Sequence, residues 1–255
     1  MKVKRRGARD AWLIDRRWSG ARSSGVARTR LIDDYLSAAL HDGIDQVVIL
    51  GSGFGCRAYR AVDIEHVPVF EIDYPTTLTQ KKERIRCILG TLPTNVAYVD
   101  MDLNRQSLRQ VMQDPGLAFN RRSFFIWEGV TNYLTEQAVD DVLRYVGRET
   151  APGSRIVFTY VHRGVLDDSA VFKGTPHLWK TLQRANETWI FGIYPDHLQA
   201  YLASRGLDLL EDMGASEYRA RYMGPPAHQM KGYELYRIAY AHVRAQPSFQ
   251  TDGTI

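Results

Sequence analysis

The chain has 255 residues, of which 44% are hydrophobic and 24% charged, with a formal net charge of +4. This composition excludes a disordered chain and favours one globular domain with a large buried core. The 2 cysteines exclude a disulfide framework and a CxxC metal site, so we expect no metal. The low cysteine count also makes a reducing cytoplasm the expected location. No apolar run reaches the ~18 residues of a membrane span, so we expect no such span.

The positive charge is concentrated at the start of the chain. Residues 1–30 hold ten Lys or Arg against two Asp, and they lack the apolar segment of a secretory signal. Such a basic arm or helix suits an anionic partner, namely a nucleic acid, a lipid surface or a carboxylate substrate, although a solvated terminus is the plainer alternative. We expect this arm, a main domain over 31–245 and a flexible tail over 246–255.

Apolar runs and helical patterns alternate through the first two thirds of the chain. The expected strands span 46–50, 67–73, 96–100, 123–128 and 155–161. The expected helices begin near residue 57, span 75–90 and 104–114, and run from 136 to 147 behind Thr135 as a cap. Strict alternation predicts an α/β fold whose mostly parallel sheet carries helices on both faces.

The pattern changes after residue 162. Residues 165–194 are rich in aromatics and predicted to be helical, either as a lid over the ligand site or as ordinary core. A helix over 195–205 and strands over 207–211 and 236–243 follow, the last as an antiparallel edge strand.

The first strand ends in a glycine-rich turn, Gly51-Ser52-Gly53-Phe54-Gly55. In an open parallel sheet, ligands bind beyond the carboxyl ends of the strands. The spacing is GxGxG rather than GxGxxG because residue 56 is cysteine, so the dinucleotide fingerprint fails. The turn therefore favours an adenosyl amino acid over NAD, with a ligand-free turn as the alternative.

Acidic residues follow the next two strands. Asp73 lies about 20 residues after the first glycine, the spacing of a carboxylate that holds ribose hydroxyls. Glu71 has the same side-chain phase along the strand, so either acid could serve. Beyond the third strand, Asp102 is placed to accept from an adenine amino group or to cap the next helix, while Leu103 packs on the ring.

The fourth strand ends at Glu128, and Tyr133 follows in the next turn. A carboxylate at this position favours a neighbouring sulfonium cation, and pairing with an arginine is the alternative. At the end of the fifth strand, Tyr160 and His162 are further candidates for contact with a substrate.

In these residues the chain resembles the leucine carboxyl methyltransferase family of class I methyltransferases. The resemblance covers about residues 26–162. It rests on Ala27-Arg28-Thr29, Asp33-Asp34, Gln46–Gly53, Arg57-Ala58-Tyr59-Arg60, Phe70–Pro75, Lys81, Asp102-Leu103 and Trp127–Leu134. Family members commonly carry an acid and a threonine at the positions of Gly55 and Cys56, which changes the contacts of that loop.

The resemblance implies a Rossmann-like seven-stranded sheet with an antiparallel last strand and S-adenosylmethionine as cofactor, S-adenosylhomocysteine being the product. It implies that Arg28 meets the cofactor carboxylate. By position, it also places Gly51 and Gly53 along the cofactor, Asp73 at the ribose, Asp102 at the adenine and Glu128 beside the methionine portion.

The resemblance further implies methyl ester formation on a carboxylate, which needs no general base. An aromatic lid favours a small hydrophobic acid, such as a polyketide or other secondary metabolite. The alternatives are a hydroxyl acceptor with His162 as base, a protein C-terminus, a modified tRNA base, a non-catalytic S-adenosylmethionine- or nucleic-acid-binding protein, and an NAD-dependent oxidoreductase. No catalytic residue is certain; Tyr133, Tyr160 and His162 are the candidates, and a homo-oligomer stays open.

Overall fold

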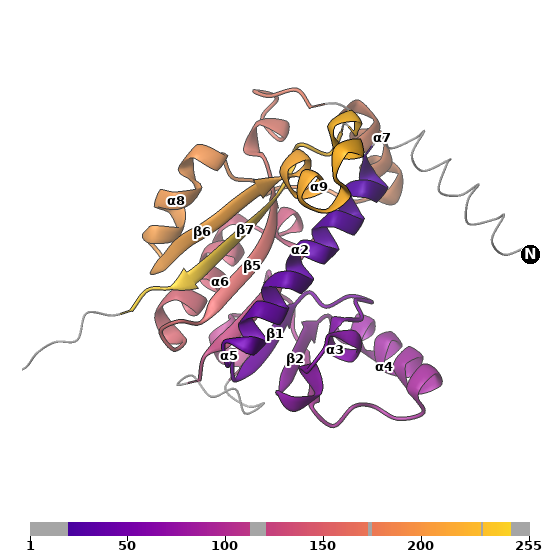
Figure 1. The fold of residues 1–255 in the computed structure, drawn as a ribbon, viewed down its shortest axis with the longest axis vertical. Coiled ribbons are helices and arrows are strands. Elements are labelled where there is room, and N and C mark those ends of the chain that lie inside the picture. Colours follow the sequence, from indigo (N-terminus) through magenta and orange to yellow (C-terminus); the bar gives the residue numbers. More distant parts are fainter. Residues whose placement is uncertain (1–19, 113–120, 173–174, 231, 246–255) are drawn as a thin grey trace, which may run out of the picture.

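The computed structural model describes residues 20–112, 121–172, 175–230 and 232–245. They form a seven-stranded sheet between two layers of helices, which confirms the expected α/β fold (Figure 1). The strands are β1 (Gln46–Leu50), β2 (Val69–Asp73), β3 (Val96–Asp100), β4 (Ser123–Trp127), β5 (Arg155–Val161), β6 (Leu207–Gly214) and β7 (Tyr236–Val243). The α-helices are α2 (Ala21–His41), α3 (Arg57–Arg60), α4 (Pro75–Leu89), α5 (Leu108–Val111), α6 (Glu136–Glu149), α7 (Thr175–Ala185), α8 (Pro195–Ala203) and α9 (Ala215–Met223). The 3-10 helices are η1 (Ile64–His66), η2 (Thr131–Tyr133), η3 (Arg163–Val165) and η4 (Pro225–Gln229).

The strand order is β3-β2-β1-β4-β5-β7-β6. Strands β1 to β5 pair in parallel, and β7 runs antiparallel to both β5 and β6. The chain connections reverse direction between β1 and β4, so a ligand crevice is expected beyond the carboxyl ends of these two strands.

The expectation that residues 236–243 form an edge strand is wrong. Strand β7 lies between β5 and β6, and β6 is the edge. The reason is that β7 is apolar on both faces: Ile238 packs into one core cluster, while Ala239 and Ala241 pack into the other. A strand that is buried on both faces fits inside a sheet better than at its rim.

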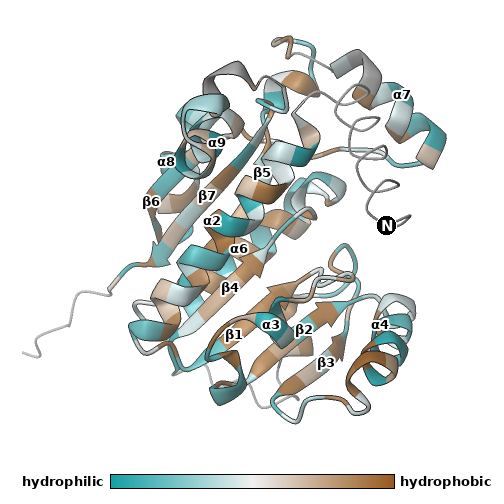
Figure 2. Ribbon diagram, turned by 45° about the vertical axis from the view of Figure 1, so that its right-hand side comes forward, coloured by the Kyte–Doolittle hydropathy of each residue, from teal (hydrophilic) through white to brown (hydrophobic). Residues whose placement is uncertain are grey.

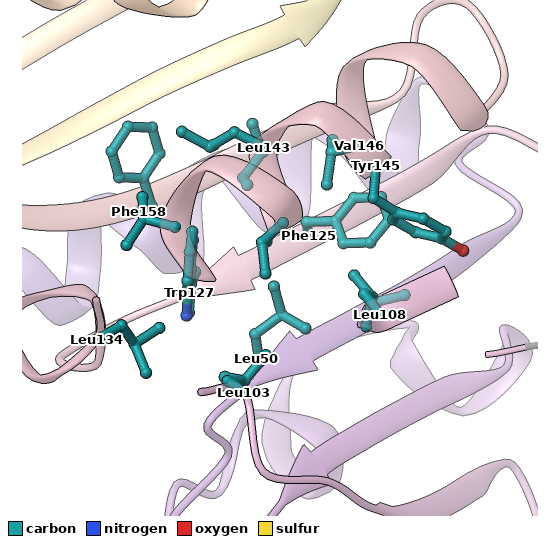
Figure 3. Close-up of a cluster of buried hydrophobic side chains, with 14 of the residues drawn as sticks. Leu50, Leu103, Leu108, Phe125, Trp127, Leu134, Leu143, Tyr145, Val146 and Phe158 are labelled. Atoms are coloured by element: carbon teal, nitrogen blue, oxygen red, sulfur yellow. The ribbon is translucent and has the colours of Figure 1, made fainter. Parts of the chain in front are cut away.

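Helices α5, α6 and α8 cover one face of the sheet. Helix α6 begins behind Thr135, whose hydroxyl oxygen accepts from the Ala138 N–H, as expected of its N-cap. The helix then turns Leu143 and Val146 toward Phe125 and Phe158 of the sheet (Figure 3). These contacts fix the position of β4, whose carboxyl end lies at the edge of the sheet where a ligand is expected.

Helices α2 and α9 cover the other face, where α2 runs diagonally along the sheet (Figure 1). Both layers are needed because the strands β1 to β4 are mostly hydrophobic, as their brown colour in Figure 2 shows. The expected domain boundary at residue 30 falls inside α2. Ala27, Leu31 and Ile32 are all buried on one side of this helix, so it belongs to the main domain from residue 21 onward.

Three helix predictions need correction. The helix expected from residue 104 begins at Leu108, because Ser107 and Gln110 form a capping box there. In the expected lid, α7 spans Thr175–Ala185 and η3 is a single turn, whereas Ile193 pairs with His162 in an isolated β-bridge. Helix α9 was not expected, because its sequence is mostly polar. Its buried residues are Ala215, Tyr218 and Arg219.

Residues 1–19 of the basic arm and the tail 246–255 lie outside the described residues. Among those described, no helix combines the length and hydrophobicity that crossing a membrane requires. The same residues contain no group of three or more metal-ligating side chains.

Candidate functional site

A cavity of about 850 Å³ opens beyond the carboxyl ends of β1, β2 and β4, at the reversal of the chain connections. It brings together most of the residues singled out from the sequence. These are Arg28, Gly51, Gly53, Glu71, Asp73, Leu103, Glu128 and Tyr133. Asp102, Tyr160 and His162 do not line it.

The glycine turn forms the cavity floor, and two of its glycines have a left-handed backbone. Gly51 has φ of 66°, and a Cβ there would lie 2.3 Å from a methyl group of Val130. Gly53 has φ of 48°, but a Cβ there would meet nothing within 4 Å. The first glycine is thus needed for packing against the β4 loop, whereas the second leaves room over the turn.

Asp73 joins this turn to β2. Its two carboxylate oxygens accept from the N–H groups of Gly53 and Tyr74, each at 2.7 Å. A carboxylate has about four acceptor positions, so two backbone donors leave capacity for ligand hydroxyls. Asp73 is half-buried at the cavity wall, so its remaining acceptor positions face a ligand that enters the cavity.

Glu71 borders the cavity, but its carboxylate points elsewhere. It is fully buried, and its oxygens accept from the Lys81 ammonium at 2.7 Å and the Tyr59 hydroxyl at 2.6 Å. Burial raises the pKa of Glu71 despite the attraction of Lys81. Both Glu71 oxygens thus bond to side chains of the protein interior, whereas Asp73 bonds to backbone N–H groups at the cavity wall.

Asp102 stabilises a turn instead of facing the cavity. Its Oδ1 accepts from the Asn104 N–H at 2.9 Å and from the Tyr74 hydroxyl at 3.0 Å. The cavity wall here is formed by Tyr74, Met101 and Leu103. The hydrogen bond from the Tyr74 hydroxyl therefore connects Asp102 to a residue of this wall.

Glu128 lies at the centre of an ion-pair network. The Arg28 Nε donates to its Oε1 at 2.7 Å, and the Arg57 Nη1 donates to its Oε2. Arg57 also donates to Asp33 at 2.8 Å. Burial alone would raise the pKa of Glu128, but the two guanidinium groups outweigh it and hold the pKa below the ordinary value.

Tyr133 connects two parts of the wall. Its hydroxyl donates to Glu187 Oε2 at 2.8 Å, and the N–H of Ile190 donates to the carbonyl of Asn132 at 2.8 Å. Burial raises the pKa of Tyr133 to about 12, and Glu187 adds to the shift. The segment after α7 is thus tied to the turn after β4, next to the cavity.

Tyr160 and His162, the other two candidates for substrate contact, do not line this cavity. The Tyr160 hydroxyl is buried against Asp212 at 2.9 Å and accepts from Arg237. The His162 Nδ1 accepts from the Gly164 N–H at 3.0 Å, where it caps η3. Each side chain is satisfied by its own surroundings.

Arg57, Tyr74 and Glu187 are among the wall residues that the sequence analysis did not name as ligand contacts. The first two carried a signal, because Arg57 follows the glycine turn and Tyr74 directly follows Asp73. Glu187 carried none, since only the path of the chain after α7 brings it to the cavity.

Comparison with known proteins supplies the family. Residues 4–147 match the family model described as leucine carboxyl methyltransferase. A candidate S-adenosyl-L-methionine-dependent methyltransferase from Mycolicibacterium gilvum is 35% identical over 131 residues, which are 51% of this chain and 42% of that protein. The like-named YktD of Bacillus subtilis is 25% identical over 218 residues, 85% of this chain and 71% of that protein. The chain thus spans less than half the length of the first relative.

Solved structures share the fold. A candidate methyltransferase from Thermobifida fusca superposes with a TM-score of 0.65 at 19% identity, covering 92% of this chain and 87% of that one. The magnesium protoporphyrin IX methyltransferase of Synechocystis, solved with bound SAH, gives a TM-score of 0.54 at 12% identity, covering 88% and 86%. The family model matches more than half of the chain. The chain therefore belongs to the leucine carboxyl methyltransferase family.

Proposed function

We propose that the protein is an S-adenosyl-L-methionine-dependent O-methyltransferase that forms a methyl ester on the carboxylate of a small molecule. The observation that carries the proposal is the cavity at the switch point. The glycine turn, Asp73 and the Glu128–Arg28 pair come from separate segments of the chain and all line it. Family membership supports the same reaction class.

The cavity fits this cofactor by the polar atoms it leaves unpaired. The Ser52 hydroxyl and the Arg57 Nη2 are buried and have no hydrogen-bond partner among the described residues, and both residues line the cavity. Unpaired buried polar groups cost about 1–3 kcal/mol each, so a ligand that bonds to them is stabilised. A hydroxyl and a guanidinium suit the amino-acid end of the cofactor.

When bound, S-adenosyl-L-methionine supplies a methyl group on a sulfonium centre. Asp73 would hold the ribose hydroxyls, and Tyr74, Met101 and Leu103 would enclose the adenine. Arg28 would bind the carboxylate of the cofactor, and the ionised Glu128 would stabilise the positive charge of its sulfonium centre. These contacts position the donor for in-line transfer and exclude water.

A carboxylate acceptor suits the residues around the cavity. No histidine, lysine or cysteine is among its lining residues in the described part of the chain. Tyr133, with a pKa of about 12, stays protonated at neutral pH and is a poor base. An ionised carboxylate is already a nucleophile, so positioning alone is sufficient for the transfer.

Calorimetric titration with S-adenosylhomocysteine, with NADH in parallel, tests the cofactor. Micromolar binding of S-adenosylhomocysteine supports the proposal, and methyl transfer from labelled S-adenosyl-L-methionine is then measured on a panel of apolar carboxylic acids and their alcohol analogues. Binding of NADH alone by the folded protein would sink it and favour an oxidoreductase.

A hydroxyl acceptor is the second candidate, because one carboxylate near Tyr133 could accept a proton. Glu187 lines the cavity and uses its Oε2 for Tyr133. If the acceptor is a hydroxyl, Glu187→Gln should lower kcat by about 10²-fold or more. If it is a carboxylate, the same variant should keep its kcat. Glu83→Gln, at an exposed position on α4, is the matched control.

A further inference from the structure

Lys81 is the one buried lysine of the described residues, and it lies directly beneath the glycine turn. It belongs to α4, its side chain is 2% exposed, and it does not line the cavity. Its ammonium group donates to Glu71 Oε1 at 2.7 Å and to the Ser52 carbonyl at 3.3 Å. One side chain thus connects α4, β2 and the turn.

The Ser52 carbonyl accepts the hydrogen bonds that hold the glycine turn in place. Besides Lys81, it accepts from the Gly55 N–H at 3.0 Å, and the next residue, Gly53, donates to Asp73. The turn is therefore held from two sides, by Lys81 at Ser52 and by Asp73 at Gly53. Displacement of the carbonyl would move the Ser52 hydroxyl and the Gly53 N–H together.

The acid of the pair is held as firmly as the lysine. The Tyr59 hydroxyl donates to Glu71 Oε2 at 2.6 Å and lies 3.0 Å from the Tyr98 hydroxyl. The Lys81 ammonium also lies 5.6 Å from the centre of the Tyr59 ring. Each carboxylate oxygen of Glu71 therefore has a donor, Lys81 at Oε1 and Tyr59 at Oε2.

Stability alone is a weak reason for such a pair. Removing two charges from water costs free energy, and apolar replacements of a buried ion pair are often neutral or stabilising. A role at the cavity accounts for the arrangement better, because the lysine also donates to the Ser52 carbonyl of the glycine turn.

We propose that Lys81, held by Glu71, is a positioning residue that sets the Ser52–Gly53 peptide in the conformation that binds the cofactor. This inference rests on the proposed function. Loss of the lysine should weaken cofactor binding and leave affinity for the methyl acceptor unchanged, because the other wall of the cavity is built from the turn after β4.

The test compares Lys81→Met, Glu71→Gln and the double variant by urea unfolding and by titration with S-adenosylhomocysteine. Each single variant leaves one buried group without its partner and should lose stability. The double variant should recover much of that stability, yet its Kd should stay about tenfold above that of the wild type, because the Ser52 carbonyl still lacks its charged donor. Lys82→Met, on the same helix, is the control and should bind normally.

Two results overturn the inference. If the double variant binds S-adenosylhomocysteine as tightly as the wild type, the pair is only structural and the proposed function stands. If the wild type itself does not bind, the proposed function fails and the positioning role fails with it. A rise in the KM for S-adenosyl-L-methionine without a rise in the acceptor KM supports it.

Discussion

Asp73 and Glu71 lie two residues apart on β2, with the same side-chain phase, and the structure gives them different partners. Lys81 and Tyr59 cover Glu71, while Asp73 lies at the strand end, bonded to two backbone N–H groups. The difference arises because Lys81 of α4 bonds to Glu71 and not to Asp73. At the scale of single residues, environment and not residue type decides which acid meets a ligand.

Asp73→Asn should therefore weaken S-adenosylhomocysteine binding by about tenfold or more. An amide has a single acceptor oxygen, so its NH₂ group would face one of the backbone donors of Gly53 and Tyr74. Calorimetry measures the change. Asp100→Asn, at an exposed position at the end of β3, should bind as the wild type does, and equal binding by both variants would contradict the role of Asp73.

His162 should make stability depend on pH. Burial lowers the pKa of His162 below its ordinary value of 6.5, and the nearby Arg237 adds to the shift. The native state therefore binds fewer protons than the unfolded state, so the free energy of unfolding should fall as the pH drops through 6.5. His162→Gln should flatten this part of the profile in urea titrations at several pH values. Parallel profiles for variant and wild type would refute it.

Helix α6 shows how local signals and packing agree at the scale of elements. Its N-cap was expected at Thr135, and its apolar stripe covers β4 and β5 (Figure 3). Helix α9 shows the opposite case, because its sequence is mostly polar. It forms where Arg219, fully buried, bonds to Ser24 of α2 and to Glu234.

Thr135→Ala should cost about 1 kcal/mol in the free energy of unfolding, the usual cost of losing an N-cap. The alanine leaves the Ala138 N–H without the acceptor that Thr135 supplies. Urea unfolding measures this loss. Thr135→Ser keeps the hydroxyl and should recover most of it, and an equal loss in both variants would mean that the methyl group matters instead.

At the scale of the whole molecule, Glu128 connects three segments that are far apart in sequence. Arg28 comes from α2, Arg57 from α3 and Glu128 from the end of β4. The pairs close the cavity on the side of α2 and join the first third of the chain to the centre of the sheet.

This network should make the stability of the protein sensitive to acid. Arg28 and Arg57 hold the pKa of Glu128 below 4.5, so its contribution to stability is present above that pH and is lost as the pH falls through the folded pKa. Between pH 6 and 3, the wild type should therefore lose more stability than Glu128→Gln, measured by urea unfolding. A steeper loss in the variant would contradict the assignment.

The sequence by itself determined the alternation of strands and helices, the edge of the sheet at which the cavity lies and several of the residues that line it. These features could be predicted because apolar runs, caps and glycines act within a few residues of the chain. Parallel strands then bring their carboxyl ends to one edge of the sheet. Asp73 and Leu103 could be found this way.

Only the tertiary structure decided which polar side chains face the cavity. It turned Glu71 toward Lys81, placed Tyr160 and His162 elsewhere, brought Glu187 to the wall and inserted β7 between β5 and β6. Each of these outcomes depends on a partner distant in sequence, chosen by burial and hydrogen bonding, and no local pattern encodes such a partner.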